Sequence, residues 1–365
     1  MHLIHNVTVF DSDATWLLFD STIESMGTGE GWKAHASNAE VIDGELGFVS
    51  RPLIETHTHG LLGYAPEGGL ESMRAIRASQ KKFGIGRSIL SLVSLSQPKI
   101  LERISDAKQL AEEDIGFLGL HLEGPYIAKS RCGAHDPEVL RKPTDAELNQ
   151  LIEAGEFKGG NVIASMTVAP ELFEQHQLAL LRNAGIRLCL GHTECSYSEA
   201  AQFFAIDGKI LTHTFNAMPG IGHRAPGPIP AAMEAAAFME LIVDNEHVQK
   251  PTGALLDHDH VVLVSDSMSA AGLTDGEYQL GNLKVQVSGS VARTETGALA
   301  GSTLTLDVAV ANYADWLGDS MAAIRSATTI PASAYGLEVP PISAGQAANL
   351  VLFDQVGKLR RSFNL

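Results

Sequence analysis

The chain has 365 residues, of which 45% are hydrophobic and 19% are charged, and its formal net charge is −17. This composition predicts a folded α/β protein with a sizeable core and excludes a disordered chain. The acidic balance argues against nucleic acid or an anionic membrane as a partner, because both are bound through an excess of lysine and arginine.

The sequence carries no signal for a membrane or for export. No apolar run reaches the roughly 20 residues that span a bilayer, and the opening MHLIHNVTVFDSD lacks the basic and apolar segments of a secretory signal. The three cysteines, Cys132, Cys189 and Cys195, form an odd and sparse set, which argues against a disulfide framework and suits a reducing compartment. We therefore expect a cytoplasmic protein.

The two ends of the chain have the pattern of a small β domain. Residues 1–48 contain the short strand-like segments VTVFD, TWLLFD and AEVIDGELG, separated by turns, and SAGQAANLVLFDQV at 343–356 supplies another. We expect a small β-sandwich-like domain built from residues 1–48 and 335–365. Residues 49–334 are then inserted between them as a second domain.

Eight apolar runs rich in branched residues follow one another across the inserted part. Helix-like segments such as PKILERISDAKQLAEED and ELFEQHQLALLRNAG lie between them. Apolar strands that alternate with helices indicate a parallel sheet covered on both faces, and eight of them match a (β/α)8 barrel of the TIM type. The predicted strands span about 49–57, 87–95, 115–123, 161–168, 186–192, 209–216, 239–244 and 261–266. Residues 276–302 are expected to form a hairpin after the eighth strand.

Residues able to bind a metal recur where the predicted strands end. Two of them, in IETHTHG, lie two positions apart and therefore on the same face of a strand. The carboxyl ends of barrel strands form one face. A closed barrel would bring all these residues to one point, whereas a doubly wound open sheet would not. The six residues are His57, His59, Glu123, His192, His213 and Asp266.

Four imidazoles and one carboxylate are more than one catalytic metal requires. Three protein ligands and an open position suffice for zinc, so five ligands would serve two ions if Glu123 bridged them. Taken singly, each ligand would be interpreted as a hydrogen-bonded buried group and Asp266 as a helix N-cap, but the whole set favours a metal. Imidazole and carboxylate accept zinc, iron and manganese alike, so the sequence leaves open the metal and whether one or two ions are bound.

Motifs spread over nearly the whole chain resemble one family. They are HTHG at 57–60, HLEGP at 121–125, GAH at 133–135, GHT at 191–193, FNAM at 215–218, HRAPG at 223–227, LVSDSM at 263–268, LAGS at 299–302 and the closing AGQAANLVLFD. On these motifs the chain resembles the N-acetylglucosamine-6-phosphate deacetylase family of the amidohydrolase superfamily. HLEGP, FNAM and HRxPG in this order are specific to that family.

The resemblance implies a metal-dependent enzyme that hydrolyses the acetamide of N-acetylglucosamine 6-phosphate to glucosamine 6-phosphate and acetate. Zinc is the expected ion, with iron or manganese as alternatives. Asp266 corresponds to the catalytic acid/base. By the same resemblance, the metal ligands are Glu123, His192 and His213 for the principal ion, and His57 and His59 for a second.

The resemblance also implies a sugar-phosphate pocket and a homodimer. In this arrangement Arg224 and His247 reach the phosphate from the neighbouring subunit. A planar guanidinium suits a phosphate because it donates two parallel hydrogen bonds to it. The positions that correspond to the family's substrate-binding residues are Ala134, His135, Asn216, Ala217, Arg224, His247, Leu299, Ala300 and Gly301.

Two departures from the family accompany these matches. Glu55 stands where the family usually has Asp, and Asn245 where it usually has Gly. The longer Glu55 is expected to weaken the second metal position, so operation with a single ion stays open.

Three alternative functions compete with this one. The substrate can be the galactosamine epimer, which the sequence does not distinguish. Another amidohydrolase of the dihydroorotase type would bridge its ions with a modified lysine at the end of the fourth strand, but that strand ends in MTVAPE. A non-catalytic sugar-phosphate sensor would have lost a ligand or Asp266, and none is lost.

Overall fold

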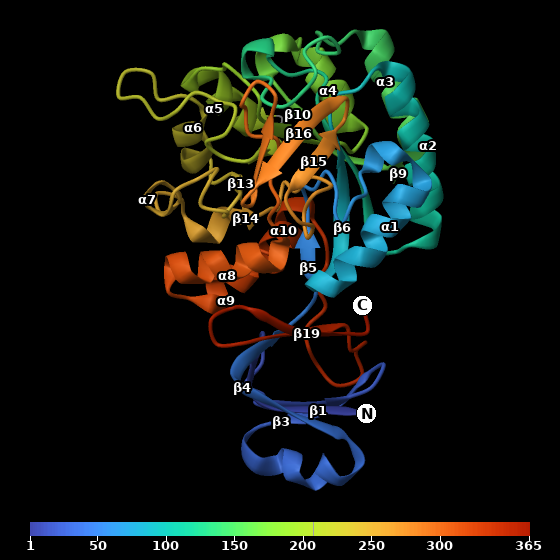
Figure 1. The fold of residues 1–365 in the computed structure, drawn as a ribbon, viewed down its shortest axis with the longest axis vertical. Coiled ribbons are helices and arrows are strands. Elements are labelled where there is room, and N and C mark those ends of the chain that lie inside the picture. The colour runs from blue at the N-terminus through green and yellow to red at the C-terminus, as the bar shows by residue number, and fades with distance from the viewer. Residues whose placement is uncertain (207) are drawn as a thin grey trace. The chain divides into compact units, whose positions relative to one another are not determined.

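The computed structural model describes residues 1–206 and 208–365 (Figure 1). The chain divides into two compact units. One contains Met1–Ile54, Gln80–Gly86 and Leu306–Leu365, and the other contains Glu55–Ser79 and Arg87–Thr305. The domain boundaries expected from the sequence, after residues 48 and 334, stay a prediction.

Strands from both ends of the chain form the sheet of the first unit. Its order is β19-β18-β4-β1-β2-β3. The C-terminal strand β18 pairs antiparallel with β4 from the N-terminal part, so the expected small β domain does combine the two termini. The strands are β1 (His2–Val9), β2 (Trp16–Phe19), β3 (Ile23–Gly27), β4 (Glu40–Ser50), β18 (Leu350–Phe353) and β19 (Leu359–Phe363).

Apolar side chains on one face of this sheet pack against a helix. Leu3, Trp16 and Leu18 form a buried cluster, against which Trp32 and Ala36 of the 3-10 helix η1 (Gly29–Asn38) pack. The unit also contains the helices α8 (Leu306–Leu317), α9 (Ser320–Arg325) and α10 (Thr329–Tyr335).

The eight predicted strands form one sheet in simple sequential order. The order is β14-β13-β12-β11-β10-β7-β6-β5, and neighbouring strands from β6 to β14 pair in parallel. The (β/α)8 fold expected from the sequence is therefore confirmed. The strands are β5 (Leu53–Glu55), β6 (Ile85–Leu92), β7 (Phe117–Glu123), β10 (Ile163–Val168), β11 (Arg187–Leu190), β12 (Gly208–Leu211), β13 (Phe238–Leu241) and β14 (Val261–Leu263).

Helices connect these strands, as the 3.6-residue apolar pattern indicates. The longest, α2 (Gln97–Glu113), buries Ile100, Ile104, Ala107 and Leu110, which lie on one face at helical spacing. The others are α1 (Leu70–Gln80), α3 (Asp145–Gly155), α4 (Gln175–Asn183), α5 (Tyr197–Ile206), α6 (Pro228–Glu234) and α7 (Lys250–Gly253). None of the described helices combines the length and the apolar composition that a transmembrane span requires.

The chain segments that follow the first and last barrel strands are joined by backbone hydrogen bonds. The amide of Asp266 donates to the carbonyl oxygen of His57 at 2.9 Å, and the amide of His59 donates to that of Ser267 at 2.7 Å. These bonds close the ring of strands at its carboxyl end, where a barrel of this type carries its active site.

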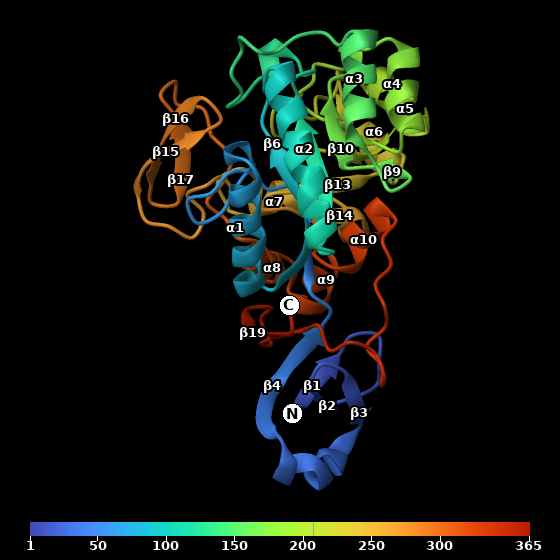
Figure 2. The same cartoon turned by 90° about the vertical axis from the view of Figure 1, so that its right-hand side faces the viewer.

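The segment expected to form a hairpin after the eighth strand is a three-stranded antiparallel sheet. It contains β15 (Gly276–Leu280), β16 (Leu283–Ser288) and β17 (Val291–Thr294). Figure 2 shows these strands beside the barrel, apart from its ring of strands. A two-stranded pair, β8 (Glu156–Phe157) with β9 (Gly160–Asn161), completes the second unit.

Candidate metal centre and active site

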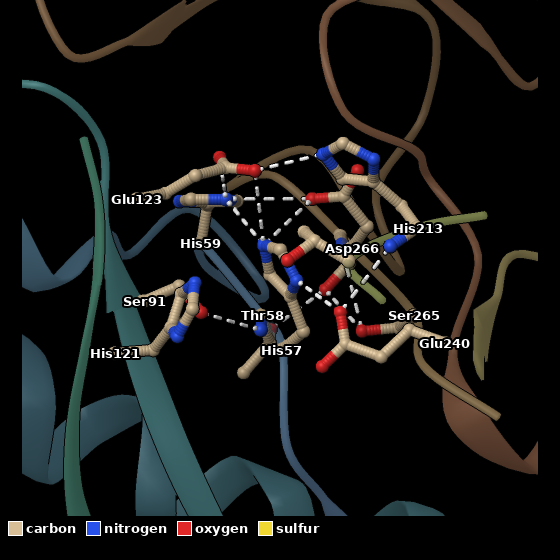
Figure 3. A network of polar contacts seen from close by, with 12 residues as sticks. His57, Thr58, His59, Ser91, His121, Glu123, His213, Glu240, Ser265 and Asp266 are labelled. Atoms are coloured by element: carbon tan, nitrogen blue, oxygen red, sulfur yellow. Dashed lines mark hydrogen bonds and ion pairs between the residues drawn. The ribbon is translucent and has the colours of Figure 1, made fainter. Parts of the chain in front are cut away.

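Two groups of three metal-binding side chains meet at the carboxyl ends of the barrel strands, and they share Glu123. Within each group the ligand atoms lie within 4.8 Å of one another, and every member is buried. Figure 3 shows the imidazoles of His57, His59 and His213 turned toward the Glu123 carboxylate. The groups are His57, His59, Glu123 and Glu123, His192, His213.

The group from the third, fifth and sixth strands is the tighter one. Glu123 Oε1 lies 2.9 Å from His213 Nε2 and 3.1 Å from His192 Nε2, and these two nitrogens are 3.0 Å apart. All five of the ligands expected from the sequence are therefore brought together. Their roles as metal ligands stay a prediction.

The group at the first strand contacts both oxygens of the same carboxylate. His59 Nε2 is 3.1 Å from Glu123 Oε2 and 3.2 Å from His57 Nε2. His57 Nε2 is also 3.6 Å from Glu123 Oε1. Both oxygens of Glu123 thus face metal-binding imidazoles, which is what a bridging carboxylate needs.

The backbone at three of these strand ends is strained. His192, His213 and Asp266 have φ values of 46°, 23° and 44°, in the left-handed region that residues other than glycine rarely adopt. Such a conformation costs of order 1–3 kcal/mol per residue and persists where surrounding hydrogen bonds impose it. Here all three side chains are buried after the ends of their strands. Strain of this kind clusters at functional sites.

The hydrogen bond of one imidazole, that of His192, fits a bound cation. His192 Nδ1 lies 2.6 Å from the carbonyl oxygen of Arg131, and an oxygen of this kind only accepts. Nδ1 therefore carries the proton, and the lone pair of Nε2 faces His213 and Glu123. A lone pair among other nitrogens and carboxylate oxygens favours a shared cation, so the residues present fit a divalent ion.

Glu123 is held in its ionised form. Burial raises the pKa of its carboxyl group, but the imidazoles of His57 and His192 and a hydrogen bond from His135 outweigh burial, so the pKa lies well below its usual range. A carboxylate rather than a carboxylic acid is what metal ligation requires.

Asp266 lies at the edge of the first-strand group. Its Oδ1 is 3.4 Å from His59 Nε2 and 3.6 Å from His57 Nε2, and the residue is 7% exposed. Burial raises its pKa, but the neighbouring His57 and His59 lower it by more, so that the net pKa is about 2. Asp266 begins no helix, so the N-cap interpretation is wrong, and its carboxylate is ionised and open to the cavity.

His135 is a buried group rather than a solvated loop residue. Its Nδ1 accepts a hydrogen bond from the amide of Ser94 at 3.1 Å, so its proton is on Nε2, which lies 3.1 Å from Glu123 Oε2. Burial lowers its pKa to about 4 even though Glu123 raises it. His135 is therefore a neutral hydrogen-bond donor at neutral pH.

A cavity of about 350 Å³ opens beside these side chains. Among the substrate-binding positions expected from the sequence, seven line it: Ala134, His135, Asn216, Ala217, His247, Leu299 and Gly301. Two do not line it. Ala300 is fully buried, and Arg224 is exposed and forms no hydrogen bond or ion pair with another residue that the structure describes.

Comparison with known proteins gives the family. No family model matches the chain. N-acetylgalactosamine-6-phosphate deacetylase of Escherichia coli is 32% identical over 313 residues, which cover 82% of each chain. N-acetylglucosamine-6-phosphate deacetylase of Bos taurus is 31% identical over 281 residues, which cover 73% of this chain and 68% of the relative. The chain belongs to the N-acetylglucosamine-6-phosphate deacetylase family.

Solved structures agree with this family. An aspartate-to-alanine mutant of N-acetyl-D-glucosamine-6-phosphate deacetylase from Mycobacterium smegmatis, in complex with N-acetyl-D-glucosamine-6-phosphate, matches with a TM-score of 0.87 and 29% identity. The match covers 100% of this chain and 97% of that one. An enamidase described as a member of the amidohydrolase superfamily matches at a TM-score of 0.52 and 16% identity, which shows the shared fold alone.

The two departures from the N-acetylglucosamine-6-phosphate deacetylase pattern are both accommodated locally. Asn245 has φ 66°, a left-handed conformation that asparagine tolerates better than most residues. The buried Glu55 carboxylate accepts hydrogen bonds from the amides of His57 at 3.1 Å and Ser265 at 3.2 Å, so it links the first and eighth strand ends. Its expected effect on the second metal position stays a prediction.

Sequence reasoning missed two buried polar groups near the ligands. His121 hydrogen-bonds to Ser165 Oγ at 2.8 Å and Thr167 Oγ1 at 2.9 Å, and burial and the neighbouring His57 hold its pKa well below the usual range, so it is neutral. Glu240 lies against His57 (Figure 3). The sequence did contain a signal for Glu240, because it is a charged residue inside the apolar strand segment MELIV, where an unpaired charge is costly.

Proposed function

We propose that the protein hydrolyses the acetamide of N-acetylglucosamine 6-phosphate to glucosamine 6-phosphate and acetate. The observation that carries the proposal is the convergence of five metal-binding side chains, four of which line one cavity together with the Asp266 carboxylate, in a chain of this family. The ions would be held by Glu123, His192 and His213 and, at the first strand, by His57 and His59.

The ion supplies two things when bound: a lowered pKa for water, toward ~7, and a polarised carbonyl. The residues of the chain do the rest. The ionised Asp266 accepts the proton of the attacking water and passes it to the nitrogen of the leaving amine, which departs as the free amino sugar. The neutral His135, whose Nε2 proton faces Glu123 Oε2 at 3.1 Å, would turn this donor toward the acetyl oxygen or the sugar when substrate binds.

Zinc is the ion we propose, with one or two ions per subunit, because the donor set of imidazoles and one carboxylate suits it. Iron and manganese accept the same ligands, so elemental analysis of purified protein decides the identity. A cytoplasmic location and the inserted-domain boundaries after residues 48 and 334 belong to the same proposal.

Phosphate recognition is proposed to need two subunits. His247 lines the cavity of its own chain, whereas the exposed Arg224 has no partner among the described residues. In a homodimer, Arg224 would reach the phosphate bound in the neighbouring subunit, whereas His247, which the sequence led us to expect there too, would contact the phosphate in the cavity of its own chain. Sedimentation at assay concentration tests this assembly, since a monomer with full activity toward the phosphorylated sugar would contradict it.

A second substrate is supported by one observation. The relative from Escherichia coli, 32% identical over 82% of this chain, is named for N-acetylgalactosamine 6-phosphate. The deciding experiment is acetate release by metal-analysed protein from both epimers and from unphosphorylated N-acetylglucosamine. We expect the highest kcat/KM for N-acetylglucosamine 6-phosphate. A higher value for the galactosamine epimer would reassign the substrate, and no acetate from either would reject the deacetylase.

A further inference from the structure

Glu240 is a buried carboxylate that the chemistry above does not use. It lies on β13, where the neighbouring residues are apolar, and it is 1% exposed. A charged side chain in such a place is costly unless it is hydrogen-bonded and close to positive charge. The contacts of Glu240 should therefore explain how a carboxylate is stabilised at this position.

One carboxylate oxygen of Glu240 contacts both metal groups. Its Oε2 lies 3.0 Å from His57 Nδ1, and it accepts a hydrogen bond from the backbone amide of His213 at 3.3 Å. The carbonyl oxygen of Glu240 also accepts from the amide of Thr214 at 2.7 Å. The same residue thus holds a side chain of the first-strand group and the backbone of the principal group.

This contact fixes the proton on His57. A carboxylate only accepts hydrogen bonds, so Nδ1 carries a proton, and Nε2 is the nitrogen that remains available to an ion. Nε2 is the atom that faces His59 and Glu123. By contrast, His59 Nδ1 is buried and has no hydrogen-bond partner in the described part of the chain. Of the two first-strand ligands, His57 is therefore the one with an anchored ring.

We propose that Glu240 is a positioning residue that makes the first-strand ion site, by holding His57 with its Nε2 lone pair toward the ion. A carboxylate on the outer nitrogen also raises the basicity of the inner one, which strengthens ligation. Because the same oxygen holds the His213 backbone, Glu240 links the geometry of the two sites. The inference rests on the proposed metal-dependent function. It assigns to Glu240 the affinity of the first-strand site for its ion.

The chain offers a matched control in Glu55. This carboxylate is as buried as Glu240, at 1% exposure, and it also lies beside His57, but its hydrogen bonds go to backbone amides and to no imidazole. Glu55→Gln therefore replaces an equally buried carboxyl group in the same region without changing the proton on a ligand. A general effect of losing a buried carboxylate would appear in both variants.

The test measures zinc affinity rather than activity. Wild type, Glu240→Ala, Glu240→Gln and Glu55→Gln are stripped of metal and titrated with Zn²⁺ against a chelator of known affinity. Loss of a residue that orients a metal-bound histidine weakens binding about 10- to 100-fold, so Glu240→Ala should weaken one equivalent by this factor. The other equivalent should change by less. Glu240→Gln should lie between, because its amide oxygen still accepts the proton of Nδ1.

A spectroscopic readout separates positioning from packing. With ¹⁵N-labelled histidine, the Nδ1–H signal of His57, assigned by its loss in His57→Asn, should persist in Glu240→Gln and disappear in Glu240→Ala. If Glu240→Ala does not fold, Glu240→Gln decides alone, by an affinity for one equivalent that is weaker than in wild type and in Glu55→Gln.

The possible failures are distinguishable. Wild-type protein that binds no zinc would overturn the proposed function and this inference together. Wild type that binds two ions, with Glu240 variants that bind both as tightly, would overturn the inference alone. An equal loss in Glu55→Gln would also overturn it, since the effect would then come from changing any buried carboxyl group beside His57 rather than from the contact with the His57 imidazole.

Discussion

The Oδ1 atom of Asp266 lies 3.4 Å from Nε2 of His59, although one residue follows the eighth barrel strand and the other the first. Closure of the barrel brings them together through the hydrogen bond from the Asp266 amide to the His57 carbonyl oxygen. The carboxylate is therefore fixed at the edge of the metal-binding groups by backbone rather than by a flexible loop. A proton acceptor held in this way is suited to act in the reaction without being a ligand.

The first prediction is that Asp266→Asn lowers kcat by roughly 10²- to 10⁴-fold, which is the usual share of positioned proton transfer. The amide is nearly isosteric with the carboxylate, so the strand end should keep its shape. Zinc content by elemental analysis and KM for the phosphorylated sugar should stay close to wild type. Turnover close to wild type in a preparation free of contaminating enzyme would remove Asp266 from the mechanism.

The second prediction concerns the number of ions. His59→Asn should lower the zinc content toward one equivalent and leave the ion on Glu123, His192 and His213, because that group has its own short distances of 2.9–3.1 Å. Folding should be retained, as measured by far-ultraviolet circular dichroism. Anomalous scattering from crystals of the variant should place the remaining ion at Glu123. A single ion elsewhere, or no loss of zinc, would contradict the assignment.

The sequence predicts the features of this site that depend on neighbouring residues, but not those that depend on residues far away in the chain. The strands and their polar ends were predictable because apolar runs and the residues after them are local, and the barrel topology then implies that His57, Glu123 and Asp266 meet. The left-handed φ of 23° at His213 was not predictable, since it is imposed by hydrogen bonds from other strands. Nor was the role of Glu240, whose partner is 183 positions away.

The sequence also did not predict which single residues of a loop are exposed to the cavity. Leu299 and Gly301 line the cavity, whereas Ala300 between them is fully buried, and its amide donates to the carbonyl oxygen of Ala292 at 3.0 Å. The motif LAGS gives the position of the segment in the chain. The direction in which each residue of it points depends on packing against β17, which the motif does not contain.

The third prediction concerns pH. Burial lowers the pKa of His247, but a 2.6 Å hydrogen bond to Asp244 raises it by more, so the net pKa lies above the usual histidine value. The positive charge of His247 therefore persists below that pKa and is lost as pH rises through it. Asp244→Asn removes the largest raising interaction, so the charge should be lost at a lower pH.

In an assay of KM for the 6-phosphate against pH, the rise of KM on the alkaline side should begin at lower pH in Asp244→Asn than in wild type. The comparison is made where the phosphate is already a dianion, so that the substrate does not titrate. Unphosphorylated N-acetylglucosamine serves as the control and should show no such shift. Superimposable profiles for the two proteins would mean that His247 does not bind the phosphate through its charge.

The last prediction concerns Arg224, which is exposed and has no partner in the described part of the chain. If its guanidinium binds the substrate phosphate across a dimer, Arg224→Met removes charge-assisted hydrogen bonds worth about 1.5–3 kcal/mol, which corresponds to roughly 10- to 150-fold in affinity. KM for the 6-phosphate should rise by this factor, while kcat/KM for the unphosphorylated sugar should hardly change. Sedimentation of the variant controls for dimer loss. An equal fall for both sugars would mean that Arg224 supports the fold or the assembly, and that other residues hold the phosphate.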